Sequence, residues 1–204
     1  MLKLPRLYPI LDPGCFIDHK SLFAAAEELL AAGITFLQYR NKSGNGREML
    51  LHARELRARL GHGVKLIMND RADLCVAAEF DGLHIGQDDL SPDSARPIIG
   101  MKRCLGVSTH NSAQLAEADK TSADYLAIGP IFATGSKVNP DPIVGLEGLR
   151  RVRELTRKPL VAIGGITRAN ARSVIEAGAD SVAVISDLLP SPRKSAEEFL
   201  ALLR

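Results

Sequence analysis

The stretch Lys65-Leu66-Ile67-Met68-Asn69-Asp70-Arg71 decides the fold, because it joins a short apolar run to an acidic residue. A second stretch, Gly82-Leu83-His84-Ile85-Gly86-Gln87-Asp88-Asp89, repeats the pattern about one strand–helix unit further along the chain. Short apolar runs bounded by polar residues are typical of buried parallel strands. Each stretch therefore predicts a strand followed by a carboxylate, Asp70 in the first and Asp89 in the second.

Asp70 and Asp89 are candidate ligands of one divalent cation. Neighbouring strands lie about 4.8 Å apart in a sheet, so the two carboxylates can meet if their strands are adjacent. Two carboxylates with positions left open for phosphate oxygens are the usual way in which proteins hold Mg²⁺. The alternative is that Asp70 only caps a helix beginning near Arg71. The repetition favours the Mg²⁺ site, to which Asn69 adds a neutral polar group.

Working outward, apolar runs of the same kind recur along the whole chain. Segments with helical apolar spacing follow them, as at 21–32, 47–60 and 146–155. The predicted strands cover residues 7–11, 34–39, 65–68, 82–85, 104–107, 125–128, 160–163 and 181–185. Strict alternation of this kind predicts an α/β protein with a parallel sheet, and eight units favour a closed barrel.

We therefore expect residues 1–204 to form a single compact (β/α)8 TIM barrel with its site at the C-terminal ends of the strands. No Gly-x-Gly-x-x-Gly motif follows the first predicted strand, which argues against an open dinucleotide-binding sheet. No linker or shift in composition suggests a second domain.

The composition excludes several classes of function. The net charge is +2, with 26 Lys and Arg scattered among 24 Asp and Glu, and only 4% of residues are aromatic. We expect no nucleic-acid partner, because binding would need a basic stripe with interleaved aromatic residues. The three cysteines, Cys15, Cys75 and Cys104, form no Cys-x-x-Cys pair, which indicates reduced thiols and no zinc site.

The expected location follows from what the sequence lacks. The first residues contain no apolar signal core, and no apolar run reaches the roughly 18 residues of a membrane span. These features predict a cytoplasmic protein with no membrane partner. Its expected partners are small-molecule substrates, and a homo-oligomer is compatible with the sequence.

A cationic segment, Gln38-Tyr39-Arg40-Asn41-Lys42, leaves the second predicted strand. Alternate residues of a strand share a face, so Gln38, Arg40 and Lys42 can point together into the barrel mouth. Such a group calls for an anionic partner, and Arg is suited to bind phosphate through two hydrogen bonds. The alternative is an ordinary solvated loop.

Two further segments are candidates for binding phosphate. Thr134-Gly135-Ser136-Lys137 follows the sixth predicted strand, although small polar residues are common in any loop. Gly164-Gly165-Ile166 and Ile185-Ser186 follow the seventh and eighth strands, where backbone N–H groups form the usual phosphate site of this fold. The sequence thus predicts two anion sites. A metal ion, Arg40 and Lys42 would form one, and backbone N–H groups after the seventh and eighth strands would form the other.

The histidines and serines near the strand ends are ambiguous. His84 lies inside a predicted strand and is expected to be a hydrogen-bonded core histidine. His110 follows the fifth strand, either at a helix start or within the site, and Ser108 at the strand tip is the better candidate ligand. No nucleophile is paired with a base, which argues against covalent catalysis.

Taken in order, these motifs resemble the thiamine phosphate synthase family over nearly the whole chain. The resemblance rests on residues 38–42, 69–71 and 86–89, and on Gly106-Val107-Ser108-Thr109-His110, Gly129-Pro130-Ile131-Phe132, Thr134-Gly135-Ser136-Lys137, Ala162-Ile163-Gly164-Gly165-Ile166 and Val184-Ile185-Ser186.

The resemblance implies a (β/α)8 transferase. Enzymes of this family join 4-amino-2-methyl-5-hydroxymethylpyrimidine diphosphate to 4-methyl-5-(2-hydroxyethyl)thiazole phosphate. They require Mg²⁺ and release thiamine phosphate and pyrophosphate after dissociative loss of pyrophosphate.

The resemblance also implies roles for individual residues. The pyrimidine diphosphate is assigned to Gln38, Arg40, Lys42, Asn69, Ser108 and Lys137, with Tyr39 and Asn41 in the same motif. The thiazole phosphate is assigned to Thr134, Gly135, Ser136, Gly165, Ile185 and Ser186. The expected metal ligands are Asp70 and Asp89, and the expected catalytic residues are Arg40, Lys42, Ser108 and Lys137.

Two positions depart from the family pattern. Ser136 stands where the family often has Thr, which is a conservative change. Asp187 follows Ile185-Ser186 where a small apolar residue is common. A carboxylate beside a phosphate site is repulsive unless it points away, so Asp187 bears on the affinity for the thiazole phosphate.

Two alternatives remain for the function. A thiazole tautomerase-like isomerase of the same fold would use His110 and would not need the diphosphate-binding residues. A noncatalytic ligand-binding barrel would be expected to have lost the metal carboxylates. The presence of Arg40, Lys42, Asp70 and Asp89 favours the synthase.

Overall fold

Eight parallel strands form a closed barrel in the computed structural model, which describes residues 2–135, 141–189 and 191–204. Each strand pairs with the next one in sequence, and the last pairs with the first. This confirms the predicted (β/α)8 fold. The strands are β1 (Leu7–Leu11), β2 (Phe36–Tyr39), β3 (Lys65–Asn69), β4 (Gly82–Ile85), β5 (Cys104–Thr109), β6 (Tyr125–Ile128), β7 (Leu160–Ile163) and β8 (Ser181–Val184).

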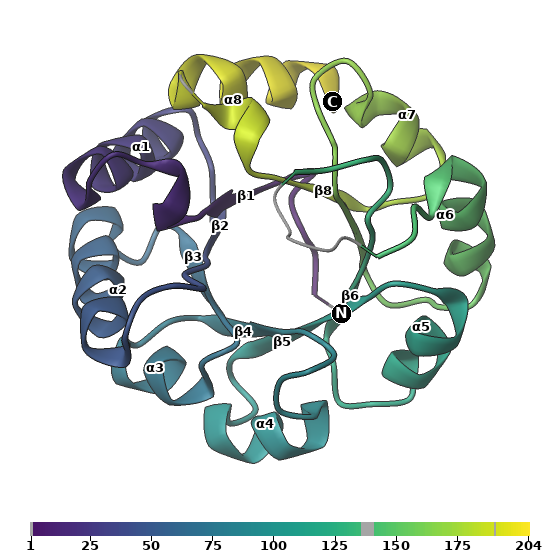
Figure 1. The fold of residues 1–204 in the computed structure, drawn as a ribbon, viewed down its shortest axis with the longest axis horizontal. Helices are drawn as coiled ribbons and strands as arrows, with labels where there is room; N and C mark the ends of the chain where they lie inside the picture. Colours follow the sequence, from purple (N-terminus) through teal and green to yellow (C-terminus); the bar gives the residue numbers. More distant parts are fainter. Residues whose placement is uncertain (1, 136–140, 190) are drawn as a thin grey trace.

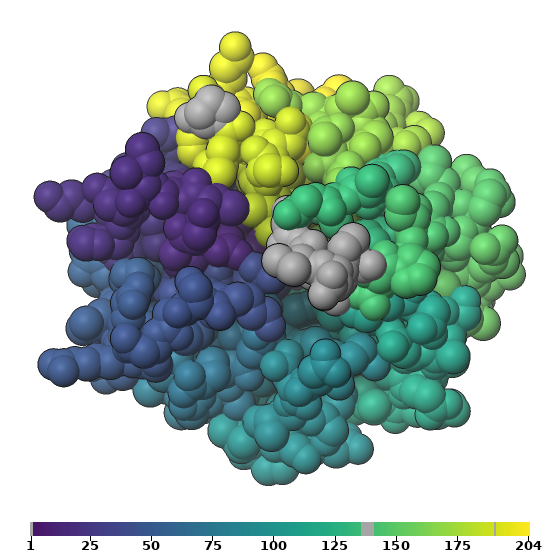
Figure 2. Space-filling view, viewed as in Figure 1, coloured from purple at the N-terminus to yellow at the C-terminus, as the bar shows by residue number. Residues whose placement is uncertain are grey.

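The helices surround this barrel as an outer ring (Figure 1). In the space-filling view, successive segments of the chain follow one another around a rounded outline (Figure 2). No helix in the described part of the chain is long and apolar enough to cross a membrane. The helices are α1 (His19–Ala31), α2 (Gly46–Leu60), α3 (Ala72–Ala77), α4 (Pro92–Ile99), α5 (Ser112–Asp119), α6 (Gly145–Glu154), α7 (Ala171–Glu176) and α8 (Pro192–Leu202), with short 3-10 turns η1 (Pro13–Cys15) and η2 (Ser186–Leu188).

Strand residues alternate between two cores. The larger core lies between the strands and the helices, and a smaller cluster of buried residues fills the barrel interior. The interior cluster includes Tyr8, Phe36, Ile67 and Tyr125. A Cβ at Gly106 would lie 2.0 Å from the ring of Tyr125, so glycine on β5 makes room for that ring. The interior is therefore packed with side chains rather than open as a pore.

Three similar Asp–Arg ion pairs lie at the amino-terminal end of the barrel. Asp124, directly before β6, accepts a hydrogen bond from Leu105 N–H at 2.8 Å and another from Arg96 Nη2 at 2.7 Å. This joins the start of one strand to the next strand and to a helix. The same arrangement recurs where Asp81 binds Leu66 N–H and Arg57, and where Asp180 binds Leu160 N–H and Arg153.

Four strand boundaries differ from the sequence prediction, and two of them by a single residue: β3 ends at Asn69 rather than at residue 68, and β8 ends at Val184 rather than at residue 185. β2 begins at Phe36 rather than at residue 34, because Ile34 N–H bonds to Leu29 O and still belongs to the end of α1. β5 extends to Thr109 rather than to residue 107, because Ser108 and Thr109 pair with β6. Ser108 therefore stands on the barrel wall, not in the loop beyond it.

Candidate active site

The carboxylates of Asp70 and Asp89 meet at the carboxyl ends of β3 and β4. Asp70 follows β3 directly, and its N–H donates to His84 O at 2.8 Å across the adjacent strand. Asp89 lies in the loop after β4 and accepts from Gly86 N–H at 2.8 Å. Burial and the nearby Asp89 carboxyl raise the pKa of Asp70 to about 6, and the contact with the Lys42 ammonium lowers it in part. Two ionised carboxylates this close repel each other, so a cation between them would stabilise the pair.

The neighbourhood of this pair fits a Mg²⁺ ion with an oxygen-rich ligand. Asp70 adopts a φ of +61°, a left-handed conformation that is uncommon for residues other than glycine. Asn69 is buried, and its Nδ2 has no hydrogen-bond partner among the described residues. Among the described residues, no group of three or more His, Cys, Asp or Glu side chains is placed to hold a metal ion.

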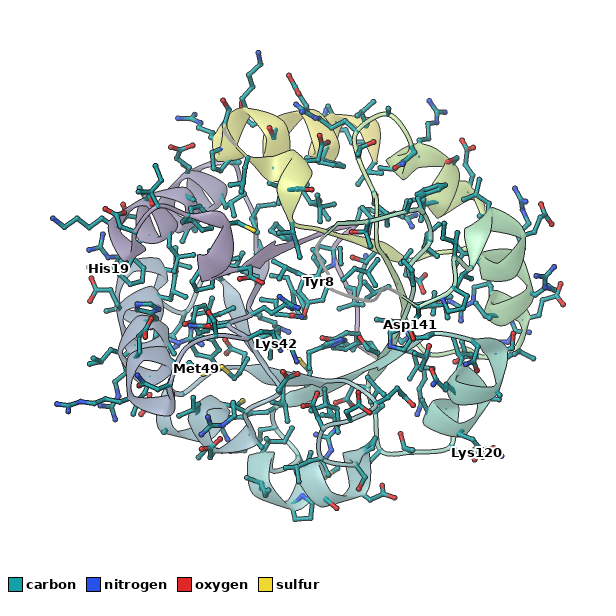
Figure 3. All side chains as sticks on the ribbon, viewed as in Figure 1. Tyr8, His19, Lys42, Met49, Lys120 and Asp141 are labelled. Atoms are coloured by element: carbon teal, nitrogen blue, oxygen red, sulfur yellow. The ribbon has the colours of Figure 1, made fainter. Side chains whose placement is uncertain are left out.

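Three side chains of the cationic segment are held in the barrel mouth by polar partners. The Arg40 guanidinium forms an ion pair with Asp12, and the Lys42 ammonium forms one with Asp70. Gln38 Nε2 donates to Tyr8 Oη at 2.8 Å inside the barrel. In Figure 3, Lys42 lies inside the ring of helices. Each cation is thus paired with a carboxylate that directly follows a strand, Asp12 after β1 and Asp70 after β3.

The side chains of Tyr39 and Asn41 do not join this group, and their assignment to substrate binding stays a prediction. Tyr39 points to the outer face of β2, where its Oη lies 3.0 Å from His52 Nδ1 of α2. Asn41 Nδ2 donates to Tyr39 Oη at 3.2 Å, and its Oδ1 accepts from Gly44 N–H at 2.7 Å. Strand alternation explains the outcome, because odd-numbered residues here face the helices. Both residues shape the loop that carries Lys42.

A chain of polar side chains crosses the barrel interior from Gln38 to Ser108. Tyr8 Oη lies 2.9 Å from Tyr125 Oη, which lies 3.0 Å from His84 Nδ1, and His84 Nε2 lies 2.8 Å from Ser108 Oγ. His84 is thus the hydrogen-bonded buried histidine that the sequence predicts. Tyr8 and Tyr125 are absent from the sequence-based site, although their alternate strand positions are a signal that they face inward.

The second predicted phosphate site lies where the loops after β6 and β7 touch. Phe132 N–H donates to Gly164 O at 3.0 Å, and Gly165 has a φ of +64°. A Cβ at Gly165 would lie 2.4 Å from Ala133 O, so only glycine allows this contact. The structure places Thr134 and Gly135 just beyond it, whereas Ser136 and Lys137 lie outside the described residues.

Ile185 and Ser186 stand at the end of β8, and Ser186 begins the short turn η2. The Asp187 carboxylate beside them is turned to Arg168, accepting from its backbone N–H at 2.8 Å and from its Nε at 3.0 Å. Arg168 also pairs with Glu198. The Asp187 carboxylate is therefore turned toward a guanidinium that it shares with Glu198, and its effect on the affinity for the thiazole phosphate stays a prediction.

His110, at the tip of β5, is tied to the loop after β6. Its Nδ1 lies 2.7 Å from Gly129 O and 3.4 Å from Asp141 Oδ2. Its N–H donates to Gln114 Oε1 at 2.7 Å. These contacts give His110 a structural role that links two loops of the mouth.

The chain matches known proteins along almost its full length. The sequence model of the family described as thiamine monophosphate synthase matches residues 7–188. A thiamine-phosphate synthase of Koribacter versatilis is 63% identical over 99% of this chain and 97% of its own. Another, from Chloroflexus aurantiacus, is 46% identical over 89% of this chain and 83% of its own. The structure of a thiamine phosphate pyrophosphorylase from Pyrococcus furiosus superposes with a TM-score of 0.86 at 32% identity, covering 97% of this chain and 95% of that one.

Proposed function

The chain belongs to the thiamine monophosphate synthase family, and on this premise we propose that it carries out the Mg²⁺-dependent form of the reaction with dissociative loss of pyrophosphate. The substrates are the pyrimidine diphosphate and the thiazole phosphate named above, and the protein is a transferase. The observation that supports the proposal is the pair of neighbouring carboxylates, Asp70 and Asp89, with the Lys42 ammonium in contact with Asp70.

Asp70 and Asp89 would hold the Mg²⁺ ion, with the unpartnered amide of Asn69 beside them as a donor to the diphosphate. When bound, the cation would neutralise the diphosphate and favour its departure. Lys42 already contacts Asp70, so it stands within reach of an anion placed at the same carboxylate. Charge that develops on the leaving group is stabilised most by donors that are in place beforehand.

Arg40 and Lys42 bind the diphosphate in this mechanism, with Lys137 as a further proposed cation. Arg40 has a carboxylate partner in Asp12 that keeps its guanidinium oriented toward the mouth until the diphosphate arrives. Departure of pyrophosphate leaves a cationic pyrimidine methylene, which the thiazole nitrogen captures. No general base is required, which agrees with the buried, fully hydrogen-bonded state of His84.

The thiazole phosphate is proposed to bind at the loops after β6, β7 and β8. Backbone N–H groups at Gly165, Ile185 and Ser186 are the proposed donors, Thr134 and Gly135 lie in the neighbouring loop, and Ser136 is proposed as a further contact from the sequence alone. Anchoring this phosphate would orient the ring nitrogen toward the methylene, so the reaction becomes effectively unimolecular. The ion pair of Asp187 with Arg168 supports this proposal, because it holds the carboxylate by a guanidinium.

The test is synthesis of thiamine phosphate from both substrates and Mg²⁺ by the purified protein. We expect EDTA to abolish synthesis and Asp89→Ala to lower the rate by at least about 100-fold, since a lost metal ligand removes several kcal/mol of charge stabilisation. Asp88→Ala is the matched control, because Asp88 is exposed in the same loop. Synthesis that survives EDTA, or equal rates for the two variants, would contradict the metal assignment.

A further inference from the structure

Five polar side chains form one continuous chain of hydrogen bonds across the barrel interior. It begins at Gln38 on β2, passes through Tyr8, Tyr125 and His84, and ends at Ser108 on β5. The first four residues are buried, whereas Ser108 is half-buried at the mouth. Tyr8 lies near the centre of the ring in Figure 3. The chain therefore connects two residues of the proposed diphosphate site, Gln38 and Ser108, through three buried side chains.

The direction of this chain follows from counting hydrogens. Gln38 Nε2 donates to Tyr8 Oη, so the single phenolic hydrogen of Tyr8 is directed to Tyr125. Tyr125 in turn directs its hydrogen to His84 Nδ1. A neutral imidazole that accepts at Nδ1 carries its hydrogen at Nε2, which donates to Ser108 Oγ. Ser108 is thus already an acceptor on its inner side.

We propose that this chain commits the Ser108 hydroxyl to act as a hydrogen-bond donor toward the substrate, with His84 and Tyr125 as positioning residues. Because Ser108 Oγ accepts from His84, its own hydrogen is directed to the mouth. The inference rests on the proposed function, in which Ser108 faces the pyrimidine diphosphate. The group that it meets is then an acceptor, a diphosphate oxygen, and the bond strengthens as pyrophosphate departs.

The surroundings support the required protonation states. His84 is buried and both of its ring nitrogens contact hydroxyl groups, so the imidazole is neutral and has one hydrogen to place. Burial raises the pKa of Tyr8 and of Tyr125, which keeps both phenols protonated. The His84 and Tyr125 rings stack with centroids 5.6 Å apart. The opposite order, with Gln38 accepting from Tyr8, would place the hydrogen on Nδ1 and present lone pairs of Ser108 to the substrate.

The tautomer can be measured without any enzymatic assay. In protein labelled with ¹⁵N-histidine, with the His84 signals assigned from a His84→Gln spectrum, we expect the ring hydrogen at Nε2 and a bare Nδ1. Tyr125→Phe keeps the stacked ring but removes the donor to Nδ1, so the Nε2 preference should weaken. A ring hydrogen at Nδ1 in the unmodified protein would overturn the proposal, whether or not the protein makes thiamine phosphate.

Coupling between Tyr125 and Ser108 supplies the kinetic test. We expect Ser108→Ala to lower kcat/KM about 10- to 100-fold, the usual effect of losing a hydrogen bond to a charged group. Tyr125→Phe should lower it less, and should have no further effect once Ser108 is alanine. Independent, multiplying effects of the two substitutions would contradict the proposed route through His84.

Ser181→Ala provides the matched control for loss of a buried hydroxyl. Ser181 is fully buried on β8, and its Oγ has no hydrogen-bond partner among the described residues. Its substitution should leave kcat/KM unchanged and should not alter the effect of Tyr125→Phe. If Ser181→Ala and Ser108→Ala coupled equally to Tyr125→Phe, the coupling would reflect general packing and the positioning role would be refuted.

Discussion

At the scale of single residues, Asp70 combines an uncommon backbone conformation with a raised pKa. A left-handed φ at a non-glycine residue costs of order 1–3 kcal/mol, so the surrounding structure must hold it in place. Its N–H bond to His84 O and its contact with Lys42 do so. The strained backbone and the raised pKa both occur at Asp70, the residue that we propose as a metal ligand. Both features are typical of functional sites.

The raised pKa of Asp70 makes Mg²⁺ uptake dependent on pH. The pKa in the folded protein, about 6, lies above the ordinary value of about 3.9, so the folded state binds this proton more tightly than the unfolded chain. The stability of the metal-free protein that derives from this proton is therefore present below about pH 4 and lost as pH rises to about 6. Metal must displace the proton, so we expect its affinity in the presence of pyrophosphate to weaken as pH falls through about 6.

Calorimetry in buffers of different ionisation heat measures both the affinity and the proton released. Pyrophosphate itself titrates in this range, so Asp70→Asn is the control that reports its contribution. The same pH dependence in Asp70→Asn as in the unmodified protein would show that Asp70 does not carry the effect.

At the scale of elements, the contact between the loops after β6 and β7 depends on one glycine. Gly165→Ala would combine a positive φ with a Cβ placed 2.4 Å from Ala133 O. We expect the free energy of unfolding to fall by about 1–3 kcal/mol and the KM for the thiazole phosphate to rise. Denaturant unfolding and steady-state kinetics measure the two effects.

Gly63→Ala is the matched control for this prediction. Gly63 lies between α2 and β3, and a Cβ there meets nothing within 4 Å. Its substitution should change the free energy of unfolding by no more than about 1 kcal/mol. Equal destabilisation by both alanines would mean that the loop contact is unimportant.

At the scale of the whole molecule, the barrel is held at its amino-terminal end by the three repeated Asp–Arg pairs. Asp124→Ala would leave the buried guanidinium of Arg96 and the N–H of Leu105 without their shared acceptor. We expect the free energy of unfolding to fall by about 1–3 kcal/mol, because an orphaned buried donor loses its hydrogen bond without regaining water. Glu117→Ala, which breaks an exposed pair with Lys120, should change it by less than about 0.5 kcal/mol.

Denaturant unfolding of both variants tests this difference, and Asp81→Ala and Asp180→Ala should resemble Asp124→Ala. If Asp124→Ala lowered the free energy of unfolding as little as Glu117→Ala, the Asp–Arg pairs would not stabilise the barrel.

The sequence by itself determined the eight strand–helix units and the set of polar residues at their carboxyl ends. Hydrophobic periodicity is local, and the apolar runs before Asn69-Asp70 and Gly86–Asp89 reveal their strands without knowledge of the rest. Eight strictly alternating units also predict closure into a barrel, because closure leaves no strand edge unpaired. The repeated carboxylate pattern was likewise readable from spacing alone.

Only the tertiary structure decided which partners these side chains have. The pairings of Asp12 with Arg40 and of Asp187 with Arg168, and the route from Gln38 to Ser108, join residues distant in the chain. Such contacts depend on strand register, which places Asn69 opposite His84, and on closure, which brings Tyr8 to Tyr125. Local propensity does not specify which side chains meet through register and closure, because these contacts are set by how all eight strands pack at once.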